Sequence, residues 1–278
     1  MPNLEAEWAN WIGRSQSQED VLTPAMLTRF RATIDSAQSG DQAPQAIHWA
    51  LCLPEAMTAA LDTDGHPKRG DFLPPLPQPR RMWASSMLDF HRPIVVGDRI
   101  ERISTIAAID QKTGGSGALT FVKIDHLTRA NEQVAVRERQ TLVYREAAMT
   151  PPPPLGEGAP NLSEWQWCRT ILPSEAMLFR FSALTFNSHR IHYDAPYAIT
   201  EELYRGLVVH GPLTATLLLD LVAREIGPNQ LKSFAFRGVS PAIAREELHL
   251  VGRRNGDEVI LAALGSDGRD VMTARGAL

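Results

Sequence analysis

Apolar and polar residues alternate with two different periods along the chain. Thr23 followed by Pro24 is typical of a helix start, and the pattern predicts a helix from there to about Ile34. A short amphipathic helix is also expected over residues 5–13. Runs rich in β-branched and aromatic residues predict four strands, at residues 83–91, 100–110, 118–129 and 132–144. Before these strands, residues 47–53 predict a strand and residues 54–61 a helix.

Two segments have neither period. Residues 62–81 are rich in glycine, proline and charge, which predicts a loop, and loops of this length are often functional. Four prolines at residues 151–154, with Gly156 and Gly158 behind them, predict a semi-rigid spacer. We therefore expect two domains, residues 1–150 and 161–278, joined by a proline-rich linker over residues 151–160.

An internal repeat relates these two parts. Residues 25–32 recur as residues 176–183 with six identities in eight positions, and residues 53–60 match residues 211–218 in kind. Each part therefore predicts one long apolar helix wrapped by an antiparallel sheet, an α+β arrangement present twice. Two such units can pair their sheet edges, so a fused tandem can take the place of a dimer. We expect a monomer that acts as a pseudo-dimer, or a homodimer.

Composition narrows the class of protein. The chain has 278 residues, 44% of them hydrophobic, and a net charge of -4, which argues against a nucleic-acid surface. Only Cys52 and Cys168 are present, too few for a disulfide framework. No apolar stretch reaches the length of about 18 residues that a membrane span needs, and the first residues lack a signal-peptide pattern. We expect a cytoplasmic protein that binds neither nucleic acid nor membrane.

Hydrogen-bonding and titratable side chains are concentrated between Leu184 and Leu213. Asn187 and His192 lie five positions apart, about 140° apart on an ideal helix, so an irregular loop would bring them together more readily. We expect His192 to carry a proton, because an unperturbed imidazole exchanges protons near neutral pH. Gly211 opens a very apolar predicted helix, where its N–H would lack a helical acceptor and lie at the positive end of the helix dipole.

The segments at residues 186–195, Phe-Asn-Ser-His-Arg-Ile-His-Tyr-Asp-Ala, and at residues 206–213, Gly-Leu-Val-Val-His-Gly-Pro-Leu, carry a resemblance to a known family. They resemble the hydratase-2 motif of MaoC-like (R)-specific enoyl-CoA hydratases and dehydratases, in the branch with a FAS1-like dehydratase N-terminal domain. The resemblance extends over most of the chain. It implies a tandem, or double, hotdog fold, and reversible addition of water to the α,β double bond of an acyl-CoA thioester without a cofactor. Within the branch, the motif variant is most similar to enzymes of itaconyl-CoA and mesaconyl-C4-CoA, which implies a branched C5 dicarboxylic acyl chain.

The resemblance also implies roles for the motif residues. Asn187 and His192 would hold and deprotonate water, and Gly211 would polarise the thioester carbonyl. Most family members carry aspartate in place of Asn187, and asparagine cannot take a proton, so the means by which this site replaces the aspartate stays open. The N-terminal half has no matching histidine pair and offers Cys52 at the third position. We expect this half to be degenerate and to shape the substrate site.

A dicarboxylic substrate needs a cationic partner for its second carboxylate. Arginine suits this task because its guanidinium binds carboxylates in a bidentate manner and stays charged. Arg190 is the strongest candidate in the sequence, with a salt bridge to Asp194 as the structural alternative. Arg81 and Arg237 are weaker candidates. We expect Tyr193 and His210 to line or brace the site.

Several alternatives stay open. The same fold serves thioesterases and fatty-acid dehydratases, and a non-catalytic acyl-CoA binder is an alternative of another class. Histidines at this spacing could hold zinc with a carboxylate, the candidates being His189, His192, Asp194 and His210. No recognised metal signature is present, so we expect no metal. The remaining histidines are predicted to be structural or exposed, and these are His48, His66, His91, His126 and His249.

Overall fold

The computed structural model describes residues 8–114, 117–147, 149–152 and 154–278. Predictions that fall on residues 1–7, on residues 115–116 of the glycine-rich turn, or on Pro153 of the tetraproline lie outside the described residues. Among the helices that the structure describes, none has the length and apolarity needed to cross a membrane.

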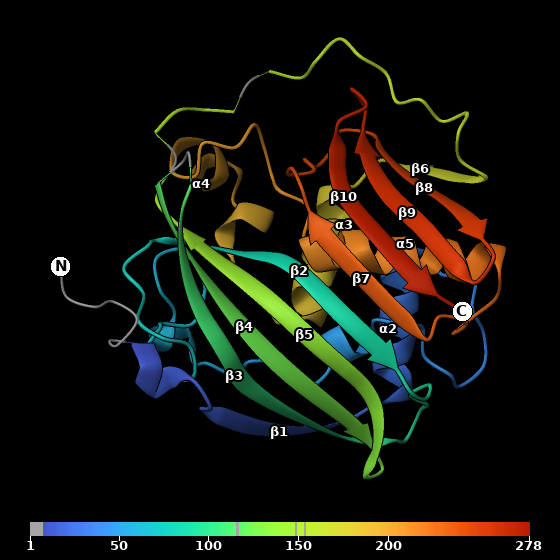
Figure 1. Cartoon of the computed structure of the whole chain (residues 1–278), viewed down its shortest axis with the longest axis horizontal. Coiled ribbons are helices and arrows are strands. Elements are labelled where there is room, and N and C mark those ends of the chain that lie inside the picture. Colours follow the sequence, from blue (N-terminus) through green and yellow to red (C-terminus); the bar gives the residue numbers. More distant parts are fainter. Residues whose placement is uncertain (1–7, 115–116, 148, 153) are drawn as a thin grey trace.

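A single antiparallel sheet of ten strands runs through both halves, in the order β1-β3-β4-β5-β2-β7-β10-β9-β8-β6 (Figure 1). The N-terminal half contributes β1 (Ser15–Val21), β2 (Arg80–Phe90), β3 (Arg99–Gly114), β4 (Gly117–Ala130) and β5 (Gln133–Arg145). The C-terminal half contributes β6 (Trp167–Ile171), β7 (Ser233–Gly238), β8 (Leu248–Asn255), β9 (Glu258–Gly265) and β10 (Asp270–Ala277). The four strands predicted in the first half are confirmed as β2 to β5. Pairing of β2 with β7, from Ser85 opposite Arg237 onward, joins the halves.

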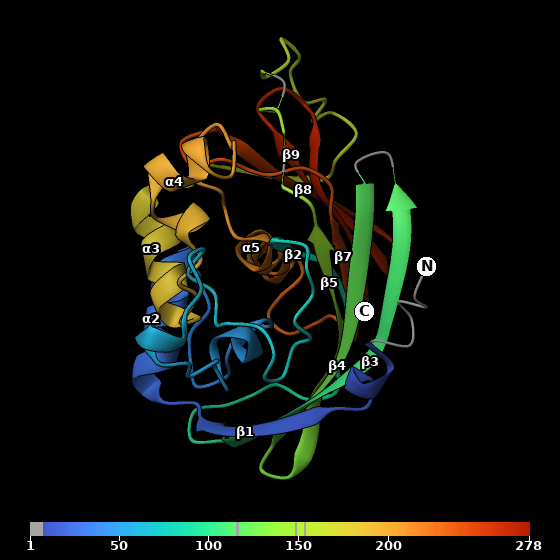
Figure 2. The same cartoon turned by 90° about the vertical axis from the view of Figure 1, so that its left-hand side faces the viewer.

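The described residues form four α-helices beside the sheet, α2 (Pro24–Ile34), α3 (Glu175–Leu184), α4 (Ala195–Thr200) and α5 (Gly211–Glu225). The helix predicted from Thr23 is confirmed, since the Thr23 hydroxyl accepts a hydrogen bond from the Met26 N–H. Its repeat, α3, begins in the same way at Ser174. These two repeated helices lie side by side, and α5 runs between them and the sheet (Figure 2). Every residue of α5 from Leu213 to Val222 is buried, as expected for a central helix.

The N-terminal half departs from the predicted repeat. Residues 47–53 were expected to form a strand and residues 54–61 a helix, and both predictions are wrong. The structure has short 3₁₀ helices there, η2 (Ile47–Ala50) and η3 (Thr58–Ala60). Residues 47–52 are all buried, so their apolar pattern has no period by which a strand could be told from a helix. Residues 54–60 are largely exposed, so a helix there would bury no apolar face. Within the described residues, α5 is therefore the one long central helix for both halves.

Candidate active site

The motif forms an irregular loop between α3 and α4, as its spacing predicted. Phe186 has a positive φ of 49°, which turns the chain after α3, and the Asn187 N–H donates to the Ser182 carbonyl oxygen at 2.9 Å. A short 3₁₀ helix, η4 (Arg190–His192), follows. The Asp194 carboxylate then accepts from the Tyr197 N–H and caps α4. These local hydrogen bonds fix the course of the loop.

His192 is buried and held in one tautomer. Its Nδ1 lies 2.7 Å from the Val208 carbonyl oxygen, which can only accept, so Nδ1 carries the proton and Nε2 keeps a lone pair. Burial lowers the pKa of His192 to about 4, and the hydrogen bond to Val208 opposes the shift. The ring also stacks on His210, with centroids 3.6 Å apart. A neutral imidazole with a free Nε2 is the form that a general base requires at neutral pH.

His210 and Gly211 form the start of α5. His210 is the N-cap residue, and its Nε2 lies 2.8 Å from the Ser182 hydroxyl, while its buried Nδ1 has no partner among the described residues. Gly211 is the first helical residue, so its N–H has no acceptor within the helix and lies at the positive end of the helix dipole. A Cβ at Gly211 would lie 3.9 Å from the Trp83 carbonyl oxygen of β2. The helix start therefore meets the N-terminal half.

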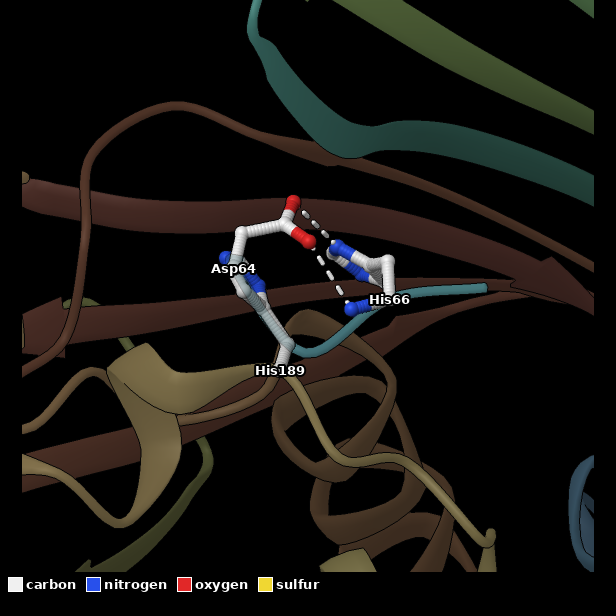
Figure 3. Close-up of side chains that lie close together, drawn as sticks. All are labelled: Asp64, His66 and His189. Carbon is white, nitrogen blue, oxygen red and sulfur yellow. Dashed lines mark hydrogen bonds and ion pairs between the residues drawn. The ribbon is translucent and has the colours of Figure 1, made fainter. Parts of the chain in front are cut away.

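Two further candidate site residues lie in the predicted loop and carry no sequence motif. Asp64 and His66 lie beside His189, as Figure 3 shows. The Asp64 carboxylate binds His66 twice, at Nδ1 (2.9 Å) and at the backbone N–H (2.8 Å). The His66 ring centroid is 4.1 Å from that of His189, which in turn is 5.5 Å from that of His192. His66 was expected to be structural or exposed, but the structure brings it into contact with the motif.

A glycine explains how the loop reaches the motif. Gly65 has a φ of 89°, and a Cβ there would lie 1.9 Å from the Ser188 carbonyl oxygen. The Ser188 hydroxyl donates to the Gly65 carbonyl oxygen at 2.5 Å, and the Arg190 N–H donates to the Asp64 carbonyl oxygen at 2.9 Å. Only glycine allows both the backbone conformation and this close approach. The loop at residues 62–81 thus contacts the motif, a position that is compatible with the function expected of it.

The charges of this cluster follow from burial and pairing. Burial works to raise the pKa of Asp64, but the hydrogen bond and charge of His66 outweigh it and lower the pKa. Burial and the charge of Arg81 lower the pKa of His66 to about 4, against the effect of Asp64. Burial also lowers the pKa of His189, with help from His66. At neutral pH, the site therefore holds an ionised carboxylate and neutral imidazoles.

In the part of the chain that the structure describes, Asp64, His66 and His189 could hold a metal ion, since their ligand atoms lie within 4.8 Å of one another. The zinc set considered from the sequence is a different one. In that set, Asp194 binds Arg190 at 2.8 Å and the His210 Nε2 faces the Ser182 hydroxyl. In the observed cluster, the Asp64 carboxylate accepts two hydrogen bonds from His66.

The candidate substrate-binding residues differ in their placement. Arg190 forms the predicted alternative, a salt bridge to Asp194, and its guanidinium also lies 4.0 Å from the Tyr197 ring centroid. Arg237 is exposed on β7, on the face opposite Phe234 and Phe236, which are buried. The Tyr193 side chain is half exposed. Arg81, at the start of β2, is half-buried, and its charge acts on His66 and His189.

Cys52, which stands in the N-terminal half at the position expected to match His210, offers no acid/base chemistry. The thiol is buried, and burial raises its pKa to about 11, so it stays protonated at neutral pH. The backbone at Cys52 has a positive φ of 52° and its N–H donates to the Asp20 carboxylate. These features fit a structural residue.

Comparison with known proteins supports the family. A family model described as hydroxyacyl-thioester dehydratase type 2 matches residues 45–244. The chain is 41% identical over 273 residues to mesaconyl-C(4)-CoA hydratase of Chloroflexus aurantiacus, with 97% of each chain covered. It is 28% identical over 255 residues to the mitochondrial hydroxyacyl-thioester dehydratase type 2 of Schizosaccharomyces pombe, which covers 82% of this chain and 81% of the relative.

Solved structures agree on the fold. A MaoC-like dehydratase superposes with a TM-score of 0.75 at 15% identity, with 98% of each chain covered. A Mycobacterium tuberculosis protein described as a double hotdog superposes with a TM-score of 0.60 at 12% identity, with 96% of each chain covered. These likenesses confirm the predicted double hotdog. Together with the match over residues 45–244 and the relative at 41% identity, they show that the chain belongs to the hydroxyacyl-thioester dehydratase type 2 family of MaoC-like hydratases and dehydratases.

Proposed function

We propose that this enzyme adds water reversibly to the double bond of a branched C5 dicarboxylyl-CoA such as mesaconyl-C4-CoA or itaconyl-CoA. The name of the relative at 41% identity supports the substrate class. The observation that carries the chemistry is the hydrogen bond from the His192 Nδ1–H to the Val208 carbonyl oxygen. It leaves a neutral Nε2 lone pair in a buried loop next to the start of α5, where a base for water and a donor for the thioester oxygen are both needed.

Each proton and electron pair has an assigned place in the proposed reaction. The His192 Nε2 takes a proton from water while the hydroxyl oxygen bonds to the β-carbon of the substrate. The π electrons move to give an enolate whose negative thioester oxygen accepts the Gly211 N–H. One such preorganised donor is typically worth about 3 to 4 kcal/mol in the transition state. The imidazolium of His192 then returns its proton to the α-carbon, so the base is regenerated.

Asn187 orients the water in this proposal. Its Oδ1 already accepts the His189 N–H at 3.0 Å, so the amide NH₂ is the group left to donate to water. A water that accepts from Asn187 has its own hydrogens free for His192. Asparagine cannot itself exchange a proton, and the single base His192 therefore serves both half-reactions.

Three related proposals concern the setting of the enzyme. We propose that it needs no cofactor, since coenzyme A is part of the substrate. We propose a monomer in which the second half replaces a partner subunit, or a homodimer of such chains, and pairing of β2 with β7 within one chain supports the former. We propose a cytoplasmic location, which the two unpaired cysteines, Cys52 and Cys168, support.

A direct assay tests the proposed reaction. Purified protein is mixed with mesaconyl-C4-CoA, itaconyl-CoA and crotonyl-CoA, and both the enoyl-thioester absorbance and free thiol are followed. We expect absorbance to fall without thiol release, fastest with a dicarboxylyl-CoA. Thiol release would identify a thioesterase, and binding without either change would identify an acyl-CoA binding protein. Faster turnover of crotonyl-CoA would replace the dicarboxylate assignment with a general (R)-enoyl-CoA hydratase or fatty-acid dehydratase.

A further inference from the structure

Three polar residues form one row across neighbouring strands of the N-terminal half. Thr120 on β4 lies opposite Tyr144 on β5, and Tyr144 lies opposite Arg81 on β2. Residues directly opposite one another in an antiparallel sheet point to the same face, so the three side chains are neighbours. The charge of Arg81 also acts on Tyr144, whose pKa is raised by burial and held back by that charge. The row is thus a contiguous group of side chains.

The polar atoms of this row are only partly paired. The Thr120 hydroxyl is fully buried and has no hydrogen-bond partner among the described residues, and the buried Tyr144 hydroxyl has no acceptor there. Arg81 is half-buried and has no anionic partner among the described residues, and its side chain acts on the Tyr144 hydroxyl as a hydrogen-bond donor. Buried hydroxyls left unpaired cost about 1 to 3 kcal/mol each. Two such hydroxyls beside a guanidinium without an anionic partner indicate that a ligand completes the row.

The chemistry of the row selects an anion. A guanidinium can only donate, and both hydroxyls can donate, so the complementary ligand is a hydrogen-bond acceptor with negative charge. A carboxylate matches the planar fork of an arginine. Nearby Arg69 adds positive charge, with its guanidinium 5.9 Å from the Tyr144 ring centroid, and its Nη1 already donates to the Leu76 and Gln78 carbonyl oxygens. Within the row itself, Arg81 supplies the charged donors.

The row lies within reach of the reacting atoms. Trp83, two residues from Arg81 on β2, places its carbonyl oxygen 3.9 Å from the Cβ position of Gly211. Two strand residues span roughly 7 Å. The charge of Arg81 lowers the pKa of both His66 and His189, which places the guanidinium on the side of the motif histidines. A short acyl chain whose thioester oxygen binds Gly211 can thus direct its other end to Arg81.

The other candidate arginines are either paired with an acid or face away from the site. Arg190 is bound to Asp194, and Arg237 lies on the outer face of β7. Arg80, next to Arg81, is buried and paired with Glu202 at 2.9 Å. Arg81 combines partial exposure, the absence of an anionic partner among the described residues, and a charge that acts on His66 and His189. Arg69 also acts on His66, but it already donates through Nη1 to the Leu76 and Gln78 carbonyl oxygens.

We propose that Arg81, assisted by the Tyr144 hydroxyl, binds the free carboxylate of the acyl chain. The N-terminal half then determines acyl specificity while the C-terminal half carries the reaction. This inference rests on the proposed hydratase function and assigns its substrate selectivity to a residue of the other half.

A cycle of two enzymes and two substrates tests the assignment. Wild type and Arg81→Met are each assayed with mesaconyl-C4-CoA and with its methyl ester at the free carboxyl group, which removes only the charge. We expect Arg81→Met to lower kcat/KM for the acid by tenfold or more, mainly through KM, and to change kcat/KM for the ester by less than about threefold. Tyr144→Phe should lower the ratio of kcat/KM for the acid to kcat/KM for the ester by about threefold. The effect is smaller than for Arg81→Met, because a hydrogen bond from a neutral hydroxyl is weaker than one from a charged guanidinium.

Matched controls separate binding from folding. Arg190→Met and Arg237→Met remove a guanidinium elsewhere and should leave the ratio of acid to ester as in wild type. Ester turnover by Arg81→Met shows that the variant is folded, and Arg81→Lys, which keeps the charge but not the bidentate geometry, should give an intermediate ratio. Equal losses on acid and ester in Arg81→Met and Arg81→Lys would overturn the assignment. A wild type that hydrates neither substrate would instead refute the proposed function itself.

Discussion

The two halves of the molecule repeat one plan but fill their interiors differently. The C-terminal half wraps its strands around α5, half of whose buried side chains are leucine. The N-terminal half holds η2 and a polar network instead, in which the Glu138 carboxylate accepts from the Trp49 indole N–H at 3.0 Å and the Ser86 hydroxyl at 2.5 Å. A duplicated unit can thus lose its central helix when its partner's helix serves both, and the vacated interior can take up polar side chains.

The difference extends to chemistry. The buried acid of the N-terminal half is tied into structure, since burial works to raise the pKa of Glu138 but its contacts with His48, His126 and Ser86 outweigh it and lower the pKa to about 2. The buried base proposed for the C-terminal half keeps a ring nitrogen available, because among the described residues His192 forms its hydrogen bond through Nδ1. In the proposed mechanism, a buried titratable group serves catalysis in one half and structure in the other, according to whether its partners leave one of its atoms unbound.

The largest expected effect separates the catalytic from the structural half. His192→Ala should lower kcat by about 10² to 10⁴-fold, the usual contribution of a placed acid/base group, with little change in the melting temperature. Steady-state kinetics and thermal unfolding measure the two. His249→Ala is the matched control, because His249 belongs to the same half but bonds to Thr170 on β6, away from the motif. Retention of a third or more of wild-type turnover by His192→Ala would contradict its role.

Glu138→Ala should lower the stability of the protein and change kcat much less. It removes a buried acceptor and leaves the Trp49 N–H and the Ser86 hydroxyl unpaired, which should lower the free energy of unfolding by about 3 kcal/mol. Urea denaturation measures this loss, while kcat of the folded fraction should change much less. Glu101→Ala removes the acceptor of a half-exposed ion pair with Arg129 and should cost less than about 1 kcal/mol. Similar losses in both variants would show that the network is not structural.

Variants of Asn187 test whether His192 is the only side chain of the motif that takes part in the reaction. Asn187→Ala should lower kcat by about 10²-fold, as expected for a misplaced water. Asn187→Asp can still orient water and should keep more activity, with a changed pH profile. Equal and near-normal rates for the two variants would exclude a role for Asn187 and leave His192 as the only motif side chain in the reaction.

A smaller effect concerns pH. Because the pKa of His192 is lowered to about 4, its Nε2 stays unprotonated above that pH, so kcat/KM should be constant from pH 8 to about 5 and fall below. Buried neutral histidines also destabilise the fold in acid, since the unfolded state takes up protons below about pH 6.5. Circular dichroism at each pH separates this loss from that of activity. A midpoint near 6.5 in fully folded enzyme would show that an ordinary, solvated imidazole controls the rate.

The sequence predicted those elements that depend on interactions between residues close together in the chain. The Thr23 cap, the four strands and the motif loop were all predicted, whereas Arg190, expected first to bind the substrate carboxylate, forms the alternative salt bridge to Asp194, four residues away. The contact of His66 with His189 joins residues far apart in the chain and depends on the approach of Gly65 to Ser188, for which no local pattern exists. The missing central helix of the N-terminal half likewise depends on α5, more than 150 residues later in the sequence.

The pairing of β2 with β7 determines when the sheet can close during synthesis of the chain. Ser85 and Arg237 are directly opposite in the sheet but separated by about 150 residues, so the seam cannot close until nearly the whole polypeptide has left the ribosome. Until then, β2 is an open edge strand of a nascent half-sheet, and such edges pair readily with other chains. The covalent fusion ensures that the next edge to emerge is the correct one. Translation order thereby protects a sheet whose two halves would otherwise have to find each other by diffusion.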